Sequence, residues 1–509
     1  MSTKTVNIRG RRWVLIALMT TIMLAAMDAT IVSTAIPHIV GDLGGFSLFS
    51  WVFSIYLLAQ TVTIPIYGKL ADLYGRKPIL LFGISLFLIG SAASAFSWDM
   101  LSLIVFRGIQ GLGAGSIMAN VNTLAGDLFS IQERAKIQGW LSSVWGMAAI
   151  TGPALGGAFA EYISWRWIFL INIPIGIIAL IFLILFLKEN VVRKKHQLDI
   201  PGAIMMLLTG GILIYTFMEG GQSFEWFSQT GIGLVSLSFV LILLTILVER
   251  RSPEPILPKW VWKNRTLVGA NLAVIAMGAM MLGPNMYLPV FSQSVYGLGA
   301  IASGFVLASI SIGWPISSSL SGRLYLRIGF RKTGSIGILA LILFSLTFSI
   351  LPAQTPIWII VLNHILLGAG FGLLSTSTMV GIQSTVPWEK RGVVTSSNMF
   401  SRYLGQSIGA AALASVFNSS MDKHISNSPK ELANQLPEVN DVIDVMQSPS
   451  SNEAVISYLQ EGFYLSTGKV YLGMAFLAVL AFLFLRLQPK KITVFKEEKS
   501  VSNPSQSIE

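Results

Sequence analysis

Long apolar runs separated by short polar segments dominate this chain. Runs of about 20 apolar residues, the length that crosses a bilayer as a helix, begin near Trp13, Leu48, Ile79, Leu101, Ile137, Trp167, Pro201, Thr230, Leu267, Ala300, Thr333, Pro356, Val393 and Ser466. The pattern predicts an all-α integral membrane protein with fourteen transmembrane helices.

The positions of the basic residues give these helices a direction. Only 12% of the 509 residues are charged, against about 25% in ordinary soluble proteins. With the N-terminus inside, all but six of the 35 Lys and Arg residues fall in inner loops and tails, as the positive-inside rule requires. The exceptions are Arg166, Lys423, Lys430 and Lys469 in outer connections and Arg107 and Arg402 within spans. Both termini are therefore expected in the cytoplasm, and the lipid bilayer is an expected partner.

Charge and composition exclude several other classes of function. The net charge of +11 is spread over short loops without an aromatic-interleaved basic patch, so it does not indicate a nucleic-acid partner. There is no Cys for disulfides or thiol-bound metal, and the four His residues are scattered. Without a clustered catalytic set or a phosphate-binding Gly-Lys-Ser loop, a membrane-embedded enzyme or sensor is a remote alternative. The sequence shows no continuous polar pore lining of the kind that would indicate a channel. We expect no metal and no cofactor.

Two halves of the chain repeat each other. Gly68–Gly75, Arg107 and Gly152 recur as Gly322–Gly329, His364 and Gly405, at offsets of 253 to 257 residues. Many transporters are built from such repeats around a site at the midplane. We therefore expect an N-terminal six-helix half (1–190), an inserted helix pair (191–265), a C-terminal six-helix half (266–487) and a cytoplasmic tail (488–509).

The outer connection within the second half, residues 418–463, is unusually long. It carries seven acidic residues and short amphipathic stretches. The sequence is compatible with a solvated acidic linker and with a lid that attracts cations to the outer mouth.

An acidic residue stands in the first apolar run. A carboxylate at the bilayer centre costs about 2.5 to 3.5 kcal/mol on insertion scales, so Asp28 is expected to be functional. Helical rise puts Asp28 about 12 Å and Arg107 about 9 Å from the outer face. Because a guanidinium favours the ionised acid and desolvation favours the protonated one, movement of either helix would change proton affinity. The alternatives are a static ion pair and, for Arg107 alone, snorkelling to the interface.

Five motifs in their expected helices resemble the fourteen-helix drug:proton antiporter branch of the major facilitator superfamily, bacterial multidrug exporters of the quaternary-ammonium type. They are Met27–Pro37, Gly68–Lys77, Arg107–Gly113, Gly152–Gly157 and Trp165–Pro174. The resemblance covers residues 13–486. It implies the major facilitator fold, proton-driven export and a bacterial cytoplasmic membrane.

Two of these motifs have a mechanical interpretation. Pro153 kinks its helix, and Gly152, Gly156 and Gly157 are expected to let a neighbouring backbone approach. The resemblance implies that this hinge marks antiporters, although ordinary membrane packing would explain it too.

The second motif with a mechanical interpretation is the loop motif, Gly68–Lys77. Gly68, Asp72, Gly75 and Arg76 form a tight inner loop. The resemblance implies a latch between the halves in the outward-open state; the alternative is a positive loop with a capping Asp. The second copy has Leu326 and Phe330 in place of Asp72 and Arg76, so any latch is one-sided.

Two other polar residues lie deep in the second half. His364 occupies the repeat position of Arg107 and could be a second proton site or a hydrogen-bonded packing residue. Arg402, about 13 Å from the inner face, is compatible with a switch, an anion contact or packing against backbone.

The substrate cavity is expected near Tyr56 and Gln60, which are one turn apart, with Asn120, Trp145 and Met147 as further candidates. Since no span besides the first holds a clear mid-membrane acid, we expect monovalent cationic, zwitterionic or neutral amphiphiles rather than dications. The predicted function is proton-coupled export of such compounds by alternating access, by a monomer. Export of one specific lipid or metabolite is the main alternative.

Overall fold

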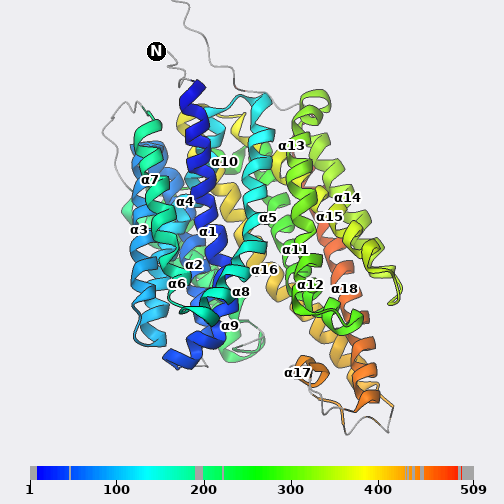
Figure 1. Ribbon diagram of the computed structural model, residues 1–509. Coiled ribbons are helices and arrows are strands. Elements are labelled where there is room, and N and C mark those ends of the chain that lie inside the picture. The colour runs from blue at the N-terminus through cyan, green and yellow to red at the C-terminus, as the bar shows by residue number, and fades with distance from the viewer. Residues whose placement is uncertain are drawn as a thin grey trace, which may run out of the picture.

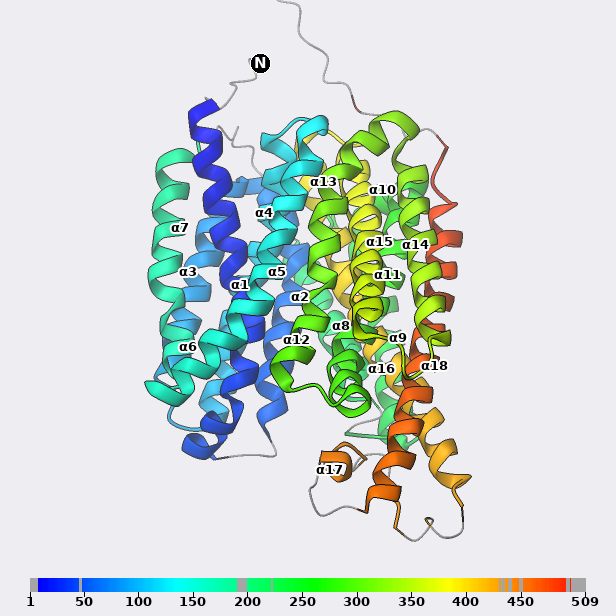
Figure 2. The same cartoon turned by 45° about the vertical axis from the view of Figure 1, so that its right-hand side comes forward.

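The computed structural model describes residues 8–44, 48–189, 199–220, 223–429, 432, 435–437, 442–447, 452–490 and 495. In these ranges the chain forms long helices that run up and down side by side, with the N-terminus at one end of the bundle and α17 at the other (Figures 1 and 2). The first half contains α1 (Ile8–Leu43), α2 (Phe49–Tyr74), α3 (Arg76–Ala95), α4 (Met100–Leu128), α5 (Ile131–Tyr162), α6 (Trp167–Leu170) and α7 (Asn172–Phe186).

The remaining helices follow in the same up-and-down order. They are α8 (Ile200–Glu219), α9 (Gln229–Arg251), α10 (Lys259–Lys263), α11 (Arg265–Tyr296), α12 (Ala300–Ala308), α13 (Ile310–Ile328), α14 (Phe330–Ile350), α15 (Ile357–Gln383), the 3-10 turn η2 (Trp388–Lys390), α16 (Arg391–Ser426), α17 (Val442–Gln447) and α18 (Glu453–Leu485).

Twelve stretches of the described residues are long and apolar enough to cross a membrane. They correspond to twelve of the fourteen runs expected from the sequence. The other two runs form α5 and α16, which are long enough at 32 and 36 residues but are more polar. The all-helical membrane fold is thus confirmed, while the count of fourteen stays a prediction.

Two spans expected as continuous helices are interrupted. The tenth breaks at Ser309, between α12 and α13, and the sixth breaks at Ile171, between α6 and α7. At Ser309 the side-chain hydroxyl donates to the Val306 carbonyl at 2.6 Å, a local hydrogen bond of the kind that bends helices.

The two halves meet along two equivalent seams. In one, α5 packs along α13; in the other, α2 packs along α16. Each seam pairs the fifth helix of one six-helix set with the second of the other, as an approximate two-fold relation between repeats requires. Small residues allow close contact: a Cβ on Gly146 would meet Ser311, and one on Gly68 would meet Ser396.

The inserted pair lies beside the second seam. Helix α8 contacts both α2 and α16, whereas α9 packs mainly on α8 and leaves most of its apolar residues exposed. This exposure fits a helix that faces lipid.

The long outer connection is shorter than expected. Helix α16 continues to Ser426 and α18 begins at Glu453, so both ends of the expected loop 418–463 are helical. The short helix α17 lies between them, at the end of the molecule opposite the N-terminus (Figure 2). Much of the rest of this connection, including Lys430, falls outside the described residues.

Candidate functional site

A cavity of about 530 Å³ lies between the two halves. Its walls are apolar and adaptable, with five Met side chains and several aromatic rings, a composition that suits varied ligands. These residues are Met118, Met277, Met281, Met379, Met399, Trp145, Trp314, Phe371 and Tyr403. Helices α1, α2, α4 and α5 supply one wall, and α11 to α13, α15 and α16 supply the other.

Neutral amides and hydroxyls interrupt the apolar walls. Gln60 donates to the Tyr403 hydroxyl at 3.1 Å and so joins the two halves. Gln383 donates to the Asn122 carbonyl at 3.0 Å, a second link between the halves. In the part of the chain that the structure describes, Arg402 is the only lining residue with a formal charge.

The buried charge pair lies behind the cavity wall. Arg107 Nη1 is 2.5 Å from Asp28 Oδ2, and Gln110 donates to Asp28 Oδ1 at 2.8 Å. All three side chains are fully buried, and none lines the cavity. The neighbours of Asp28 on α1, Ala29 and Thr30, do line it, so one helix carries both the acid and part of the cavity surface.

Aromatic and backbone groups hold Arg107 in place. Its guanidinium lies 4.2 Å from the ring centre of Tyr56, and its Nε donates to the Val52 carbonyl at 3.2 Å. Hydrogen bonds from Arg107 Nη1 to both Asp28 and Gln110 complete the arrangement. Such desolvated, paired charges are strongly coupled because little water screens them.

A second charged network joins the halves at the end of the bundle where α1 begins. Asp72 accepts hydrogen bonds from the backbone N–H groups of Gly392 and Val393, at 2.9 and 2.8 Å, where α16 begins. Arg76 donates to Asp72 at 2.6 Å and to the Trp388 carbonyl at 2.6 Å, and its guanidinium lies 3.8 Å from the Trp388 ring centre. An anionic side chain at a helix N-terminus is favoured by the helix dipole.

Asp127 extends this network through α4. It accepts from Arg76 at 3.1 Å and from Arg391 of the other half at 3.2 Å. Gly75, with φ of +100°, makes the turn into α3. The first N–H groups of α3, those of Arg76 and Lys77, donate to Glu189 at 2.8 Å each.

The Gly-Pro motif of α5 packs against α1. A Cβ on Gly152 would meet the Thr30 side chain, and one on Gly156 would meet the Ile31 carbonyl and Thr34. Thr30 donates to the Ala148 carbonyl at 3.0 Å, one turn before Pro153. The expectation that Gly157 also lets a neighbouring backbone approach is wrong, because a Cβ there would meet nothing within 4 Å. Gly157 faces away from α1.

His364 is a packing residue in the described structure. Its Nδ1 lies 2.8 Å from the Ile360 carbonyl, and its Nε2 lies 2.5 Å from the Tyr471 hydroxyl. The ring packs edge-on against Phe348, is fully buried, and does not line the cavity.

The expected substrate residues divide into two groups. Gln60 and Trp145 line the cavity. Tyr56 is buried under Arg107, Asn120 donates to the Ser116 carbonyl within α4, and Met147 is 47% exposed on α5 away from the lining. Rotation about the helix axis separates them, since residues at one depth can point in different directions.

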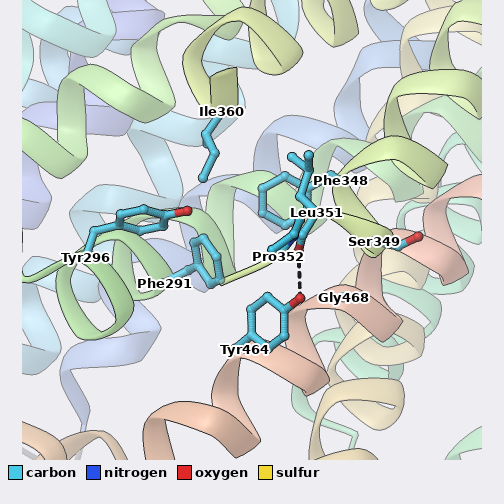
Figure 3. A pocket seen from close by; sticks show the side chains of 9 residues that line it. All are labelled: Phe291, Tyr296, Phe348, Ser349, Leu351, Pro352, Ile360, Tyr464 and Gly468. Carbon is cyan, nitrogen blue, oxygen red and sulfur yellow. Dashed lines mark hydrogen bonds between the residues drawn. The ribbon is translucent and has the colours of Figure 1, made fainter. Parts of the chain in front are cut away.

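A second small space lies in the second half, near the C-terminal ends of α11 and α14. Figure 3 shows its rim of aromatic side chains, where Tyr464 donates to the Leu351 carbonyl at 2.6 Å. Its volume of about 10 Å³ suits a single water molecule. A drug-sized ligand does not fit there.

Several residues of these networks were missed by the sequence interpretation. Gln110 had a signal, because it lies one helical turn from Arg107. The sequence carried no comparable signal for Asp127, Trp388 and Arg391, because charged and aromatic residues are ordinary at the ends of membrane helices.

Comparison with known proteins agrees with this arrangement. A model of the Major Facilitator Superfamily matches residues 18–410. Multidrug resistance protein 3 of Bacillus subtilis is 35% identical over 82% of this chain and 81% of its own length. Multidrug transporter protein MdtP of the same organism is 33% identical over 94% of this chain and 95% of its own.

The fold also matches solved structures. The human organic anion transporter MFSD10 superimposes with a TM-score of 0.62 at 15% identity, covering 93% of this chain and 99% of that one. A bacterial homologue of the iron transporter ferroportin gives 0.58 at 12% identity, covering 92% and 99%. Together, the two-half helical fold, the central cavity and the matched relatives show that this chain is a multi-pass membrane transporter, not an enzyme, and that it belongs to the Major Facilitator Superfamily.

Proposed function

We propose that the protein exports amphiphilic drugs from the bacterial cytoplasm in exchange for protons. The observation that carries the proposal is the buried Asp28–Arg107 pair directly behind the wall of a Met-rich and aromatic cavity. The two Bacillus relatives, named as multidrug proteins, support the drug class.

The coupling step follows from the chemistry of the pair. Protonation removes the negative charge of Asp28 and leaves Arg107 without a counter-ion in a desolvated place, which is costly. The pair is then expected to separate, and α1 is free to move relative to α4. Since α1 also lines the cavity and packs on the Gly-Pro segment of α5, this movement would change the substrate site.

Helix α4 offers a connection to the inner gate. It carries Arg107 and Gln110 towards its outer end and Asp127 at its inner end, 20 residues from Arg107 and about 30 Å away along a straight helix. A shift of α4 on protonation would disturb the contacts of Asp127 with Arg76 and Arg391. In this proposal the Asp72–Arg76 network closes the inner face while the proton site is loaded from outside.

The proposal includes the finer topology. We propose fourteen spans, with α5 and α16 crossing the membrane as polar helices that line the cavity, and both termini in the cytoplasm. It keeps the domain limits 1–190, 191–265, 266–487 and 488–509, a monomeric state, and no cofactor besides the proton gradient.

Transport by purified protein in proteoliposomes tests the function. Dyes, quaternary ammonium compounds and fluoroquinolones would be offered to vesicles with an acidic interior, where inside-out protein should accumulate drug. We expect uptake that stops when an ionophore collapses the pH difference, and drug-induced proton release from the vesicles. Uptake of no compound in the panel, or uptake independent of the gradient, would contradict the proposal and favour export of one specific lipid or metabolite.

A further inference from the structure

The cavity has a charge imbalance that the drug-exporter proposal does not explain. Arg402 is half-buried about a third of the way along α16. Among the described residues it is the single charged side chain that lines the cavity, and no Asp or Glu lines it. The other buried cation at mid-membrane depth, Arg107, is neutralised by Asp28 behind the wall. The surface offered to a substrate therefore carries one uncompensated positive charge.

Arg402 also lacks protein partners for its donors. Among the described residues, no carboxylate pairs with it and no hydrogen bond from its guanidinium is formed; its Nε is buried without an acceptor. The nearest aromatic contact is the ring of Tyr403, 5.3 Å from the guanidinium carbon. A guanidinium has five donors; the buried Nε–H of Arg402 without an acceptor is costly, and its two Nη groups are not among the buried atoms without a partner.

The backbone around Arg402 is fixed. The Arg402 carbonyl lies against Gly278 of α11, where no side chain would fit. One turn further along α16, Gln406 lines the same cavity and points its amide at Met281 Sδ, 3.8 Å away. The guanidinium is thus presented on a packed helix, next to a neutral amide, at the wall of the cavity.

We infer that Arg402 is the binding site for a carboxylate group of the substrate, so that the cavity prefers amphiphiles carrying a carboxylate over the same compounds without it. A carboxylate matches the planar donor geometry of a guanidinium and accepts two of its hydrogen bonds at once. The apolar walls, with Trp145 and Trp314, then accommodate the ring system. This inference rests on the proposed function and narrows its substrate class to zwitterionic and anionic amphiphiles.

Binding to the purified full-length protein tests the inference without transport. The probes are norfloxacin, which has a carboxylate and a protonated amine at neutral pH, and its methyl ester, which keeps the amine and lacks the acid. Isothermal titration calorimetry should give about tenfold or greater preference of the wild-type protein for the acid, the scale of a charge-assisted hydrogen-bonded pair.

Three variants locate the effect. Arg402→Gln should lower the affinity for norfloxacin to that for the ester, while the affinity for the ester stays within about twofold. Arg402→Lys should retain part of the preference, because it keeps the charge but not the planar fork. Arg327→Gln removes an exposed guanidinium at the end of α13 that does not line the cavity; it is the matched control and should retain the full preference.

Three results would overturn the inference. They are equal affinities of the wild type for norfloxacin and its ester, no binding of either compound, and a preference for the acid that survives in Arg402→Gln. The wild-type comparison and Arg402→Lys decide the matter if Arg402→Gln does not fold. A protein that exports cationic dyes with protons but shows no acid preference would refute this inference and leave the proposed function standing. Preferential binding of the acid without proton-driven export would refute the proposed function and leave this inference standing.

Discussion

At the level of single residues, Asp28 and Arg107 form an ion pair because their two helices place them at the same depth and facing each other. The sequence indicated the common depth from helical rise. Gln110 completes the arrangement by donating to the second carboxylate oxygen. Asp28 does not line the cavity, whereas Ala29 and Thr30 of the same helix do, so substrate and proton are expected to communicate through α1.

The first prediction concerns this acid. Asp28→Asn removes the titratable group while keeping an oxygen for Arg107, and we expect drug-induced proton release to fall by at least about tenfold. Fluorescence of a pH dye in proteoliposomes measures the release. Undiminished coupling in the variant would refute the role of Asp28 and leave the fold assignment intact.

Asp42 provides the matched control. It lies near the C-terminal end of α1, where hydrogen bonds from Arg166 and Trp165 lower its pKa below the ordinary value. It therefore stays ionised at the neutral pH of the assay, and it makes an exposed ion pair with Arg166, of the kind worth little in stability. Asp42→Asn should leave coupling unchanged.

The second prediction separates His364 from proton transfer. His364→Phe removes the ring nitrogens, leaves the Tyr471 hydroxyl without its partner, and should cost about 1 to 3 kcal/mol of stability. Thermal unfolding should show this loss, whereas the number of protons exchanged per drug should not change. A reduced proton number would revive the alternative of a second proton site.

At the level of elements, the Asp72–Arg76 network depends on where α2 ends and α16 begins. Asp72 is placed by the last turn of α2 so that it accepts from the first N–H groups of α16. Its repeat counterpart, Leu326, is an exposed apolar side chain with no such capacity. The contacts made by the two copies of the loop motif are therefore asymmetric between the halves, as the two sequences suggested.

The third prediction tests this gate. Asp72→Ala removes both acceptors and one of the two carboxylate partners of Arg76, so in the proposed mechanism the inner face should open more often. Because the chain has no Cys, Asn122→Cys at the cavity can report access to a thiol reagent added from the cytoplasmic side. Labelling should rise several-fold in the Asp72→Ala background and stay unchanged with Leu326→Ala; equal labelling in both would contradict the latch.

The fourth prediction uses the glycines of α5. Gly156→Ala places a methyl group against the Ile31 carbonyl and Thr34, and such overpacking costs about 1 to 3 kcal/mol. Gly157→Ala meets nothing within 4 Å and should preserve both thermal stability and export. If the two variants behave alike, close packing of α5 on α1 is not what this motif provides.

At the level of the whole molecule, two related halves enclose one cavity, and the contacts between them follow two equivalent seams. The inserted helix α8 covers the seam of α2 and α16 and contacts both. This placement indicates that the insert stabilises one side of the interface between the halves rather than contributing to the cavity, since no residue of α8 or α9 lines it.

The fifth prediction concerns topology. If α5 and α16 cross the membrane, Tyr162→Cys and Lys423→Cys should react with an impermeant maleimide on intact cells. Gln132→Cys and Glu389→Cys, at the opposite helix ends, should react only after permeabilisation; all four positions are exposed. Labelling of both ends of α5 or α16 from one side would rule out fourteen spans.

The sequence by itself determined the class of fold, predicted the direction of the helices, and indicated the internal repeat and the common level of Asp28 and Arg107. These properties follow from run length, loop charge and helical rise, which are local and additive along the chain. Because rise fixes depth, the pairing of Asp28 with Arg107 could be anticipated.

Only the tertiary structure decided which side chains meet. Rotation about each helix axis and the choice of neighbouring helix depend on packing of the whole bundle, and no local pattern fixes them. For this reason Tyr56 and Asn120 lie behind the wall while Gln60 lines the cavity, and Asp127 joins Arg76 to Arg391 of the other half. For the same reason Arg402, which the sequence left open between packing and anion contact, stands as the single charge facing the cavity.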